Sequence, residues 1–389
     1  MNKKVLLGIS GGVDSTIAAL LLKQQGYEVI GAFMKNFSET KSKLTGECSW
    51  REEKRMAQRI CAQLNIPLLT IDGEEEYTNK VLSPMFKQYS KGRTPNPDIG
   101  CNTQIKFPLL LKEAKKLNCN FIATGHYAKI KKSFGSYGTF GCSRNTNKKS
   151  HKFLDIRKQG NSYLLQRGKD ETKDQSYFLY QLSSKVLAKT IFPVGNLTKE
   201  EVRALAEKNN FPNYNKQSSR GICFVGKVPM QEFLKQKIEE NSGLVLSPER
   251  KVLGTHKGLA FYTRGQRIGP RIGINFNEQA KHLTNQKWFV AKKEKNNILI
   301  IAPENHPSLL TKDVSITNFK TNLNKSSIPK SLKARYRHLG QIISGNLSFS
   351  KNKVKFIFNK PQKGIATGQH IVFYKGKTLI AGGIMHDSP

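Results

Sequence analysis

The sequence lacks a hydrophobic run long enough to cross a bilayer. A membrane-spanning helix needs about 18 or more consecutive apolar residues, and the apolar segment near the N-terminus is interrupted by Gly11, Gly12 and Asp14. The same interruption argues against a secretory signal peptide behind the basic start Met-Asn-Lys-Lys. We therefore expect a soluble, cytoplasmic protein with no membrane partner.

Closely spaced cysteines are absent as well. The chain has six cysteines, at positions 48, 61, 101, 119, 142 and 223, and none forms a C-x-x-C pair. This spacing excludes the usual zinc-finger and thioredoxin-type signatures. Disulfide frameworks are uncommon in cytosolic chains, so most of these cysteines are expected to be small buried hydrophobes.

Acidic residues are scarce. Against 65 Lys and Arg the chain has 28 Asp and Glu, which gives a formal net charge of +37. Such an excess favours a polyanionic partner, most naturally nucleic acid. A lysine-rich composition without RNA binding is the alternative. Charge alone does not distinguish the two, so the choice between them depends on specific motifs.

Four short apolar runs near the N-terminus read as buried strands. They cover residues 4–9, 28–34, 67–72 and 121–126. Helical patterns lie between them. The first pattern stops before Gly26, a helix C-terminal signal, and the second opens with the capping-box spacing of Ser49 and Glu52. Strands that alternate with helices predict a parallel α/β sheet, whose ligands bind beyond the carboxyl ends of the strands.

Beyond the predicted sheet, the composition and the hydrophobic periodicity of the sequence change twice. Residues 131–162 are rich in Ser, Gly, Asn and Lys without periodicity, which predicts a long surface loop or a hairpin insertion. A helical pattern begins again at Thr198, which has capping-box spacing to Glu201. After residue 288, short alternating strands and a hairpin turn at Tyr-Lys-Gly-Lys predict a small β-barrel or sandwich.

The segment Ser-Gly-Gly-Val-Asp-Ser at residues 10–15 directly follows the first predicted strand. A glycine pair at this point lets successive backbone N–H groups surround an anion, with a helix N-terminus behind them. The hydroxyls of Ser10 and Ser15 can add donors. Asp14 would repel phosphate, but it suits a Mg²⁺ ion that bridges its carboxylate and the phosphates. A glycine turn with a solvated aspartate is the alternative.

This sextet resembles the pyrophosphate-binding loop of the ATP-pyrophosphatase (PP-loop) superfamily, which cleaves ATP between its α and β phosphates. Further segments resemble the tRNA-specific 2-thiouridylase (MnmA) family, and the resemblance runs from residue 3 to about residue 386, nearly the whole chain. The segments are MKN (34–36), GRTPNPDIGCNTQIKF (92–107), ATGHY (123–127), KDQSYFLYQL (173–182), SSRGICFVG (218–226) and GQRIG (265–269).

The resemblance implies three domains. Residues 1–220 would form a Rossmann-like, parallel-sheet PP-loop catalytic domain, and residues 221–287 a small central linker domain. Residues 288–389 would form a C-terminal β-barrel that binds tRNA. The predicted fold class is therefore α/β with an added β-barrel.

The resemblance also implies an activity, the ATP-dependent 2-thiolation of the wobble uridine in Glu, Gln and Lys tRNAs. The 2-oxo group is a poor leaving group, so adenylation would convert it to an ester from which a sulfur nucleophile displaces AMP. An unpaired uridine can be splayed out into a pocket for this reaction. The implied cofactors are ATP and Mg²⁺, and the implied partners are tRNA and a sulfur donor, either a cysteine desulfurase or a sulfur-relay protein.

Residue by residue, the resemblance assigns three catalytic positions. Cys223 would carry a persulfide, Cys101 would release its sulfur and leave a Cys101–Cys223 disulfide, and Asp98 would act as acid or base. ATP binding is implied for Gly8, Ile9, Ser10, Gly11, Gly12, Val13, Asp14, Ser15, Met34 and Gly125, with Asp14 as the metal ligand. Contacts to tRNA are implied for Asn96, Pro97, Asp98, His126, Lys173, Asp174, Gln175, Arg335, Tyr336 and Gln369. For His126 a structural hydrogen bond is the alternative.

Three other classes of protein stay open at this point. A PP-loop amidoligase that acts on a small molecule would share the glycine loop, but it has no use for Cys101, Cys223 or a basic β tail. A non-enzymatic RNA-binding protein predicts erosion of the loop, yet the glycine pair and Asp14 are intact. An iron–sulfur-dependent tRNA thiolase could use Asp98, Cys101 and Cys223 as cluster ligands.

Overall fold

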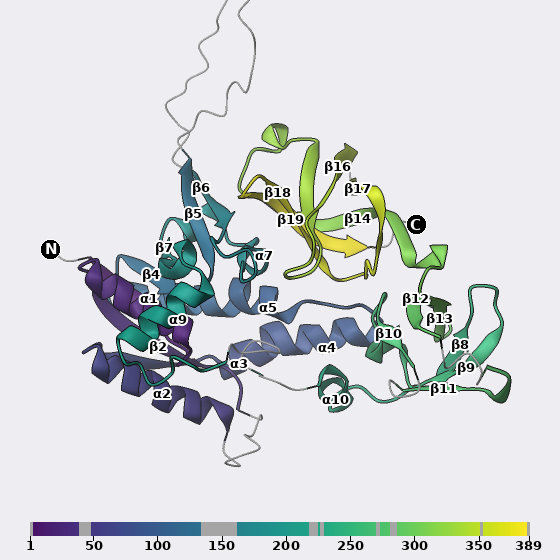
Figure 1. Ribbon diagram of the computed structural model, residues 1–389, viewed down its shortest axis with the longest axis horizontal. Coiled ribbons are helices and arrows are strands. Elements are labelled where there is room, and N and C mark those ends of the chain that lie inside the picture. The colour runs from purple at the N-terminus through teal and green to yellow at the C-terminus, as the bar shows by residue number, and fades with distance from the viewer. Residues whose placement is uncertain are drawn as a thin grey trace, which may run out of the picture.

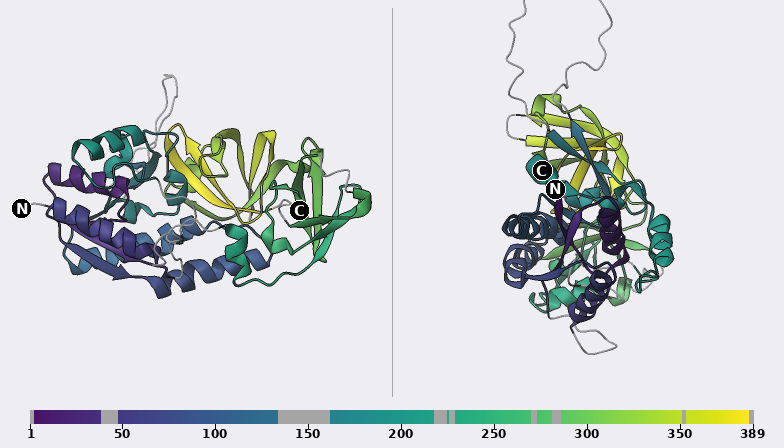
Figure 2. Two further views of the ribbon diagram at one scale, coloured as in Figure 1. Left: turned by 60° about the horizontal axis from the view of Figure 1, so that its bottom comes forward. Right: turned by 90° about the vertical axis from the view of Figure 1, so that its left-hand side faces the viewer.

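The structure is a computed structural model, in which three sheets organise the chain (Figure 1). It describes residues 3–38, 48–133, 162–217, 225, 229–269, 273–280, 286–350 and 353–386. The N-terminal sheet and the central sheet lie at opposite ends of an elongated molecule, and the C-terminal barrel lies between them on one side (Figure 2). No helix among the described residues has both the length and the apolar character that a membrane span requires.

The N-terminal sheet is parallel, with the strand order β3-β2-β1-β4-β7. Its strands are β1 (Lys4–Gly8), β2 (Glu28–Lys35), β3 (Leu68–Asp72), β4 (Phe121–Thr124) and β7 (Thr190–Ile191). The four predicted strands and the predicted parallel α/β sheet are confirmed. The short β7 was not predicted, because two residues are too few to show any hydrophobic period.

Helices cover both faces of this sheet. They are α1 (Val13–Gln24), α2 (Ser49–Gln63), α3 (Glu74–Tyr77), α4 (Ser83–Ser90), α5 (Pro97–Gly100), α6 (Phe107–Lys116), α7 (Ser176–Leu179), α8 (Ser184–Leu187) and α9 (Lys199–Lys208). Residues of α1, α2 and α9 share one hydrophobic cluster with Val5 and Leu7 of β1. Leu6, which points to the opposite face, belongs to the cluster that contains α4 and α6. A strand that is apolar on both faces is typical of a buried parallel sheet.

The predicted helix ends are confirmed in two of three cases. Helix α1 stops before Gly26, which has a φ of +79° in the left-handed region. Thr198 and Glu201 form the reciprocal capping box at the start of α9. The capping box expected at Ser49 is wrong, because Cys48 takes the N-cap position of α2 without a side-chain hydrogen bond.

Two π-helical turns lie between helices of the N-terminal domain. One, η1 (Thr78–Leu82), lies between α3 and α4, and the other, η2 (Cys101–Lys106), lies between α5 and α6. The two turns contact each other. Such turns are rare and occur frequently at functional sites, and the candidate nucleophile Cys101 is the first residue of η2.

The central sheet is mixed, with the strand order β10-β12-β13-β8-β9-β11. Its elements are α10 (Met230–Lys235), β8 (Gly243–Leu246), β9 (Val252–His256), η5 (Leu259–Phe261), β10 (Arg267–Ile268), β11 (Ile274–Phe276), β12 (Trp288–Glu294) and β13 (Ile298–Pro303). The domain boundary predicted at residue 288 falls before β12 and β13, which are hydrogen-bonded into this sheet. An alternating apolar pattern cannot tell which of two neighbouring sheets a strand will join.

The C-terminal strands form a closed barrel, as predicted from their alternation. They are β14 (Leu310–Thr321), β15 (Ser331–Arg335), β16 (Ile343–Ser350), β17 (Lys353–Lys363), β18 (His370–Lys375) and β19 (Thr378–His386). The order β14-β17-β16-β15-β18-β19 closes through the pairing of β14 with β19. The predicted hairpin turn is confirmed at Gly376, between β18 and β19.

A hairpin of the N-terminal domain extends this barrel. Strands β5 (Ala128–Ser133) and β6 (Ser162–Arg167) pair with each other, and β6 pairs with β19 at Gln166 and Thr378. The predicted hairpin insertion is thus confirmed at its base. The rest of the predicted insertion, residues 134–161, lies outside the described residues. Strands of the N-terminal domain and of the barrel are thus hydrogen-bonded within one sheet.

We expect Gly382 of β19 to tolerate no side chain at this junction. A Cβ atom there would lie 2.5 Å from Cδ2 of Tyr180 and 2.9 Å from the carbonyl oxygen of Ile371. Overpacking of this kind costs about 1–3 kcal/mol, so Gly382→Ala should lower the melting temperature. Gly269→Ala is the matched control, because its Cβ would meet no described atom within 4 Å. Equal melting temperatures for the two variants would contradict this packing.

Candidate active site

The glycine loop lies where the sequence predicts it, at the carboxyl end of β1. Gly12 is the N-cap of α1, so the second half of the loop forms the first turn of this helix, and the first N–H groups of the helix face the glycine pair. Gly11 has a φ of +70°, and a Cβ there would lie 2.5 Å from the carbonyl oxygen of Glu53. The hydroxyl of Ser15 donates to the carbonyl of Gly12 (2.9 Å) and accepts from the N–H of Ser10 (3.3 Å). These contacts hold the loop in the shape that an anion site requires.

A second glycine brings β4 against this loop. A Cβ on Gly125 would lie 2.7 Å from the backbone nitrogen of Ser15 and 2.8 Å from the carbonyl carbon of Asp14. Only glycine therefore allows this approach. Met34, near the end of β2, is buried beside the same edge of the sheet. The predicted ATP-binding residues thus gather at the carboxyl ends of β1, β2 and β4.

The carboxylate of Asp14 is held by two residues that the sequence analysis missed. The hydroxyl of Tyr127 donates to Oδ1 of Asp14 (2.7 Å), and the ammonium of Lys199 pairs with the same oxygen. Lys199 is buried at the start of α9 and also lies over the Tyr127 ring. Burial, and then the negative charge of Asp14, raise the pKa of Tyr127 far above its usual range, so its hydroxyl keeps its proton. The one signal in the sequence that could have indicated a role for Lys199 is its position directly after the capping residue Thr198.

His126 makes the structural hydrogen bond that was the alternative to RNA contact. Its Nδ1 lies 2.7 Å from the hydroxyl of Thr124, and its ring stacks on Phe107. The ring is buried, and burial lowers its pKa well below the usual value. His126 is therefore neutral at pH 7 and carries no charge that could attract a phosphate.

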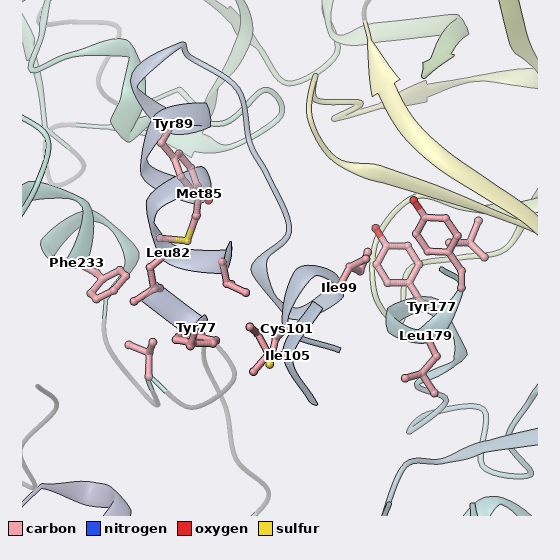
Figure 3. Packing of buried hydrophobic residues seen from close by; sticks show 14 of the residues in the cluster. Tyr77, Leu82, Met85, Tyr89, Ile99, Cys101, Ile105, Tyr177, Leu179 and Phe233 are labelled. Atoms are coloured by element: carbon pink, nitrogen blue, oxygen red, sulfur yellow. The ribbon is translucent and has the colours of Figure 1, made fainter. Parts of the chain in front are cut away.

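Cys101 is fully buried in the described structure. In Figure 3 its side chain and that of Ile105 point toward Tyr77, whereas Ile99 points the opposite way, toward Tyr177. All five residues belong to the same hydrophobic cluster. In this arrangement the thiol is shielded from solvent, so a reaction partner must reach it through the cluster or the segment must move.

Asp98 lies one helical turn ahead of Cys101. Asn96 is the N-cap of α5, and its side chain accepts from the N–H of Ile99 (3.2 Å). Asn102 then donates to the carbonyl of Asp98 (3.0 Å). These bonds fix the short helix that carries Pro97 and Asp98. The catalytic prediction for Cys223 falls outside the described residues, so its approach to Cys101 stays a prediction.

Two of the predicted tRNA contacts are buried against each other. The carboxylate of Asp174 accepts from the N–H groups of Gly168 (3.2 Å) and Ser176 (3.1 Å), and from the Ser176 hydroxyl (3.1 Å). Arg335 of β15 donates to it from the barrel (2.8 Å). The side chain of Asp174 is 0% exposed. The ion pair therefore connects the N-terminal domain to the barrel. Contacts of these two residues with RNA stay predictions.

The remaining predicted tRNA contacts are partly exposed. Gln175 accepts from the N–H of Tyr127 (3.0 Å), and Tyr336 donates to the carbonyl of Lys363 (3.2 Å). The side-chain oxygen of Gln369 is buried and has no hydrogen-bond partner in the described structure. Lys173 lies next to Asp174 and is half-buried. Their contacts with RNA stay predictions.

Two of the cysteines expected to be structural fit that interpretation. Cys61 is buried on α2, and burial raises its pKa to about 11. Cys119 is half-buried, and burial raises its pKa too. Neither thiol is activated. The corresponding prediction for Cys142 lies outside the described residues.

Comparison with known proteins agrees with this architecture. Three family models match in sequence: a tRNA methyl transferase HUP domain over residues 3–227, a tRNA methyl transferase PRC-barrel domain over 231–303 and an aminomethyltransferase β-barrel domain over 309–385. The tRNA-specific 2-thiouridylase MnmA 1 of Geobacillus kaustophilus is 38% identical, over 99% of this chain and 96% of its own length. The tRNA-specific 2-thiouridylase MnmA of Nitrosomonas eutropha is 37% identical over the full length of both.

The chain belongs to the tRNA-specific 2-thiouridylase (MnmA) family. The predicted family is thus confirmed. The family models also separate the central and barrel domains between residues 303 and 309, where the observed sheets separate. Among solved structures, a 4-thiouridine synthetase–RNA complex with bound ATP aligns with a TM-score of 0.34 at 14% identity, over 60% of this chain and 50% of that one, which is too weak to carry an argument.

The buried pair between the domains leads to a stability prediction. Arg335→Met removes the closest cation of the buried Asp174 carboxylate and leaves Arg167 (3.6 Å) as its remaining charged partner. Breaking a buried pair completely costs about 3–5 kcal/mol, so we expect this variant to be destabilised by up to that amount. The double variant Asp174→Asn, Arg335→Met should be destabilised by clearly less than the sum of the single variants. Urea unfolding of the three variants measures both quantities.

The matched control is Lys116→Met, which removes the partner of Glu113 in an exposed pair (2.7 Å). Exposed pairs contribute at most about 1 kcal/mol, so this variant should unfold like the wild type. Strictly additive single effects at Asp174 and Arg335 would refute an energetic coupling between the two domains at this point.

Proposed function

We propose that the chain catalyses the ATP-dependent 2-thiolation of the wobble uridine in Glu, Gln and Lys tRNAs. The observation that carries the proposal is the full-length match to tRNA-specific 2-thiouridylases, together with a glycine loop folded as an anion site. The products other than thiolated tRNA are AMP and pyrophosphate. The net charge of +37 is consistent with a polyanionic substrate of this kind.

The loop at residues 10–15 would bind the pyrophosphate part of ATP. Its helix N-terminus offers backbone N–H groups to the phosphates, and Ser10 and Ser15 add hydroxyls. Adenylation of the uridine O2 makes AMP the leaving group, which is far better than oxide. Asp98 would move the proton that this exchange requires.

Asp14 would hold Mg²⁺ against the phosphates. Magnesium is usually bound through one or two carboxylates plus substrate phosphates, and Asp14 is the carboxylate on the loop. The ion would neutralise charge that develops on the departing pyrophosphate. Lys199 shares Oδ1 of Asp14 in the described structure, so it is placed to contact the same phosphates once a metal takes over its position at the carboxylate.

Sulfur would pass through the two cysteines in balanced steps. A donor, either a cysteine desulfurase or a sulfur-relay protein, leaves a persulfide on Cys223. The Cys101 thiolate attacks the inner sulfur, a Cys101–Cys223 disulfide forms and hydrosulfide leaves. Hydrosulfide then displaces AMP from C2 of the uridine, and an external dithiol reduces the disulfide with two electrons. Because Cys101 is fully buried in the described structure, the α5–η2 segment must open for this step.

Asp14→Asn should slow the conversion of ATP to AMP at least tenfold, which corresponds to about 1.4 kcal/mol. The amide keeps the size of the side chain but removes the charge that would hold the metal. The Mg²⁺ concentration for half-maximal rate should rise in Asp14→Asn. It should not rise in Lys199→Met, which breaks the same ion pair from its other side and removes the cation that competes with the metal. Equal Mg²⁺ requirements would mean that Asp14 serves only the ion pair.

The cysteine pair can be tested by mass spectrometry after incubation with a cysteine desulfurase and cysteine. Cys101→Ser should accept a persulfide on Cys223 but fail to thiolate tRNA, whereas Cys223→Ser should accept none there. In the intermediate state the two Cα atoms must come within about 4.4–6.8 Å to form the disulfide. Cys61→Ser, at a buried thiol with a raised pKa, should leave thiolation unchanged. Full thiolation by Cys223→Ser, or a persulfide found only on Cys101, would overturn the assignment.

A further inference from the structure

A cavity of about 660 Å³ lies where the three domains meet. The N-terminal domain contributes residues 90–94, the connection that leads from α4 toward α5. The central domain contributes residues around 238–241, 258–264 and 292–297. The barrel contributes residues 366–367. No residue that the mechanism uses lines this cavity.

The lining is strongly basic and contains no aromatic side chain. Six cations line it, Lys91, Arg93, Arg264, Lys292, Lys293 and Lys295, against the two carboxylates Glu239 and Glu294. Glu294 is already engaged by Arg250 (2.7 Å) and Lys292 (3.2 Å). The cavity therefore keeps a clear excess of positive charge. Without an aromatic surface for base stacking, it suits a phosphate group better than a nucleobase.

Lys293 is a cation of this cavity that reaches from the central domain to the N-terminal segment. Its ammonium donates to the carbonyl oxygen of Gly92 (2.9 Å), and no ion pair of the described residues includes it. A lysine has three N–H donors, so one backbone carbonyl leaves two of them for a ligand. Burial lowers the pKa of Lys293 to about 7. An anion bound beside it would stabilise the charged form.

The cavity is also tied to the candidate active site through the chain. Thr94 donates its N–H to the carbonyl of Thr367 (2.9 Å), and its hydroxyl lies 3.3 Å from that of Thr263. One residue thus connects the N-terminal segment to both other domains. Arg93 and Asp98 are five positions apart in the chain, a span of at most about 18 Å. An RNA bound at Asp98 would therefore lie within about 18 Å of Arg93 in this cavity.

We propose that this cavity binds a backbone phosphate of the substrate tRNA through Lys293, Lys91 and Arg93. The proposal deepens the proposed function and rests on it, because that function supplies the RNA. A phosphate contact fixes the register of the RNA and reads no sequence. It would therefore hold the tRNA while the uridine enters the pocket near Asp98.

The test measures the affinity for unmodified tRNA and for an unrelated RNA of equal length between 50 and 300 mM salt, in the full-length protein. Lys293→Met should weaken the binding of both RNAs by about tenfold and reduce the log–log salt slope by about one. Lys91→Met changes an exposed side chain, so it should fold normally. It should also weaken RNA binding and reduce the salt slope, to a smaller degree than Lys293→Met. This variant tests the proposal if Lys293→Met folds poorly. Lys208→Met, an exposed lysine at the end of α9 and far from the cavity, is the matched control.

Two further variants separate charge from structure. Lys293→Arg keeps the charge and should keep the salt slope. Lys293→Gln keeps a donor for the carbonyl of Gly92 without the charge, and should lose the slope as Lys293→Met does. Wild-type slopes in Lys293→Gln and Lys91→Met, or an equal loss in Lys208→Met, overturn the proposal. Thiolation by the wild type is assayed in parallel, so a failure of the proposed function is distinguishable from a failure of this phosphate site.

Discussion

The Asp174 carboxylate is the constraint on which the arrangement of the N-terminal domain and the barrel depends. It lies two residues before α7, near the end of the segment that follows β6, and it accepts hydrogen bonds from its own domain and one from Arg335 of the barrel. A buried charge is stable only when its partners stay in place. The pairing of β6 with β19 also holds the N-terminal domain against the barrel. Removing the barrel would therefore leave Asp174 with Arg167 as its only ion-pair partner among the described residues and would expose the edge of β6.

The opposite end of the N-terminal domain depends on close backbone contact. Gly11 and Gly125 allow the loop, β4 and the start of α1 to meet at distances that a side chain would prevent. Around this contact Asp14, Tyr127 and Lys199 form a compact polar network. The carboxylate that is proposed to hold a metal is thus already oriented, and its environment is set by residues more than 100 positions away in the chain.

Much of this structure was predictable because its signals are local. The buried strands of the parallel sheet, the loop at residues 10–15 and the capping box at Thr198 each depend on a few neighbouring residues. What could not be predicted depends on distant pairing. Strands β12 and β13 have the same alternation as barrel strands but pair with β8 and β10. Asp174 and Arg335 read as surface residues of RNA-binding segments, because sequence does not reveal that each neutralises the other.

The π-helical turn at Cys101 has a consequence for how a buried thiol can react. A π turn contains about one residue more than an α-helical turn. Gaining or losing one residue in such a turn rotates the following side chains by about 100° around the helix axis, the angular step of one residue. The contact between η1 and η2 places two such turns side by side. Cys101 is the first residue of η2, so any change of helical register in this turn would move the buried thiol relative to the hydrophobic cluster.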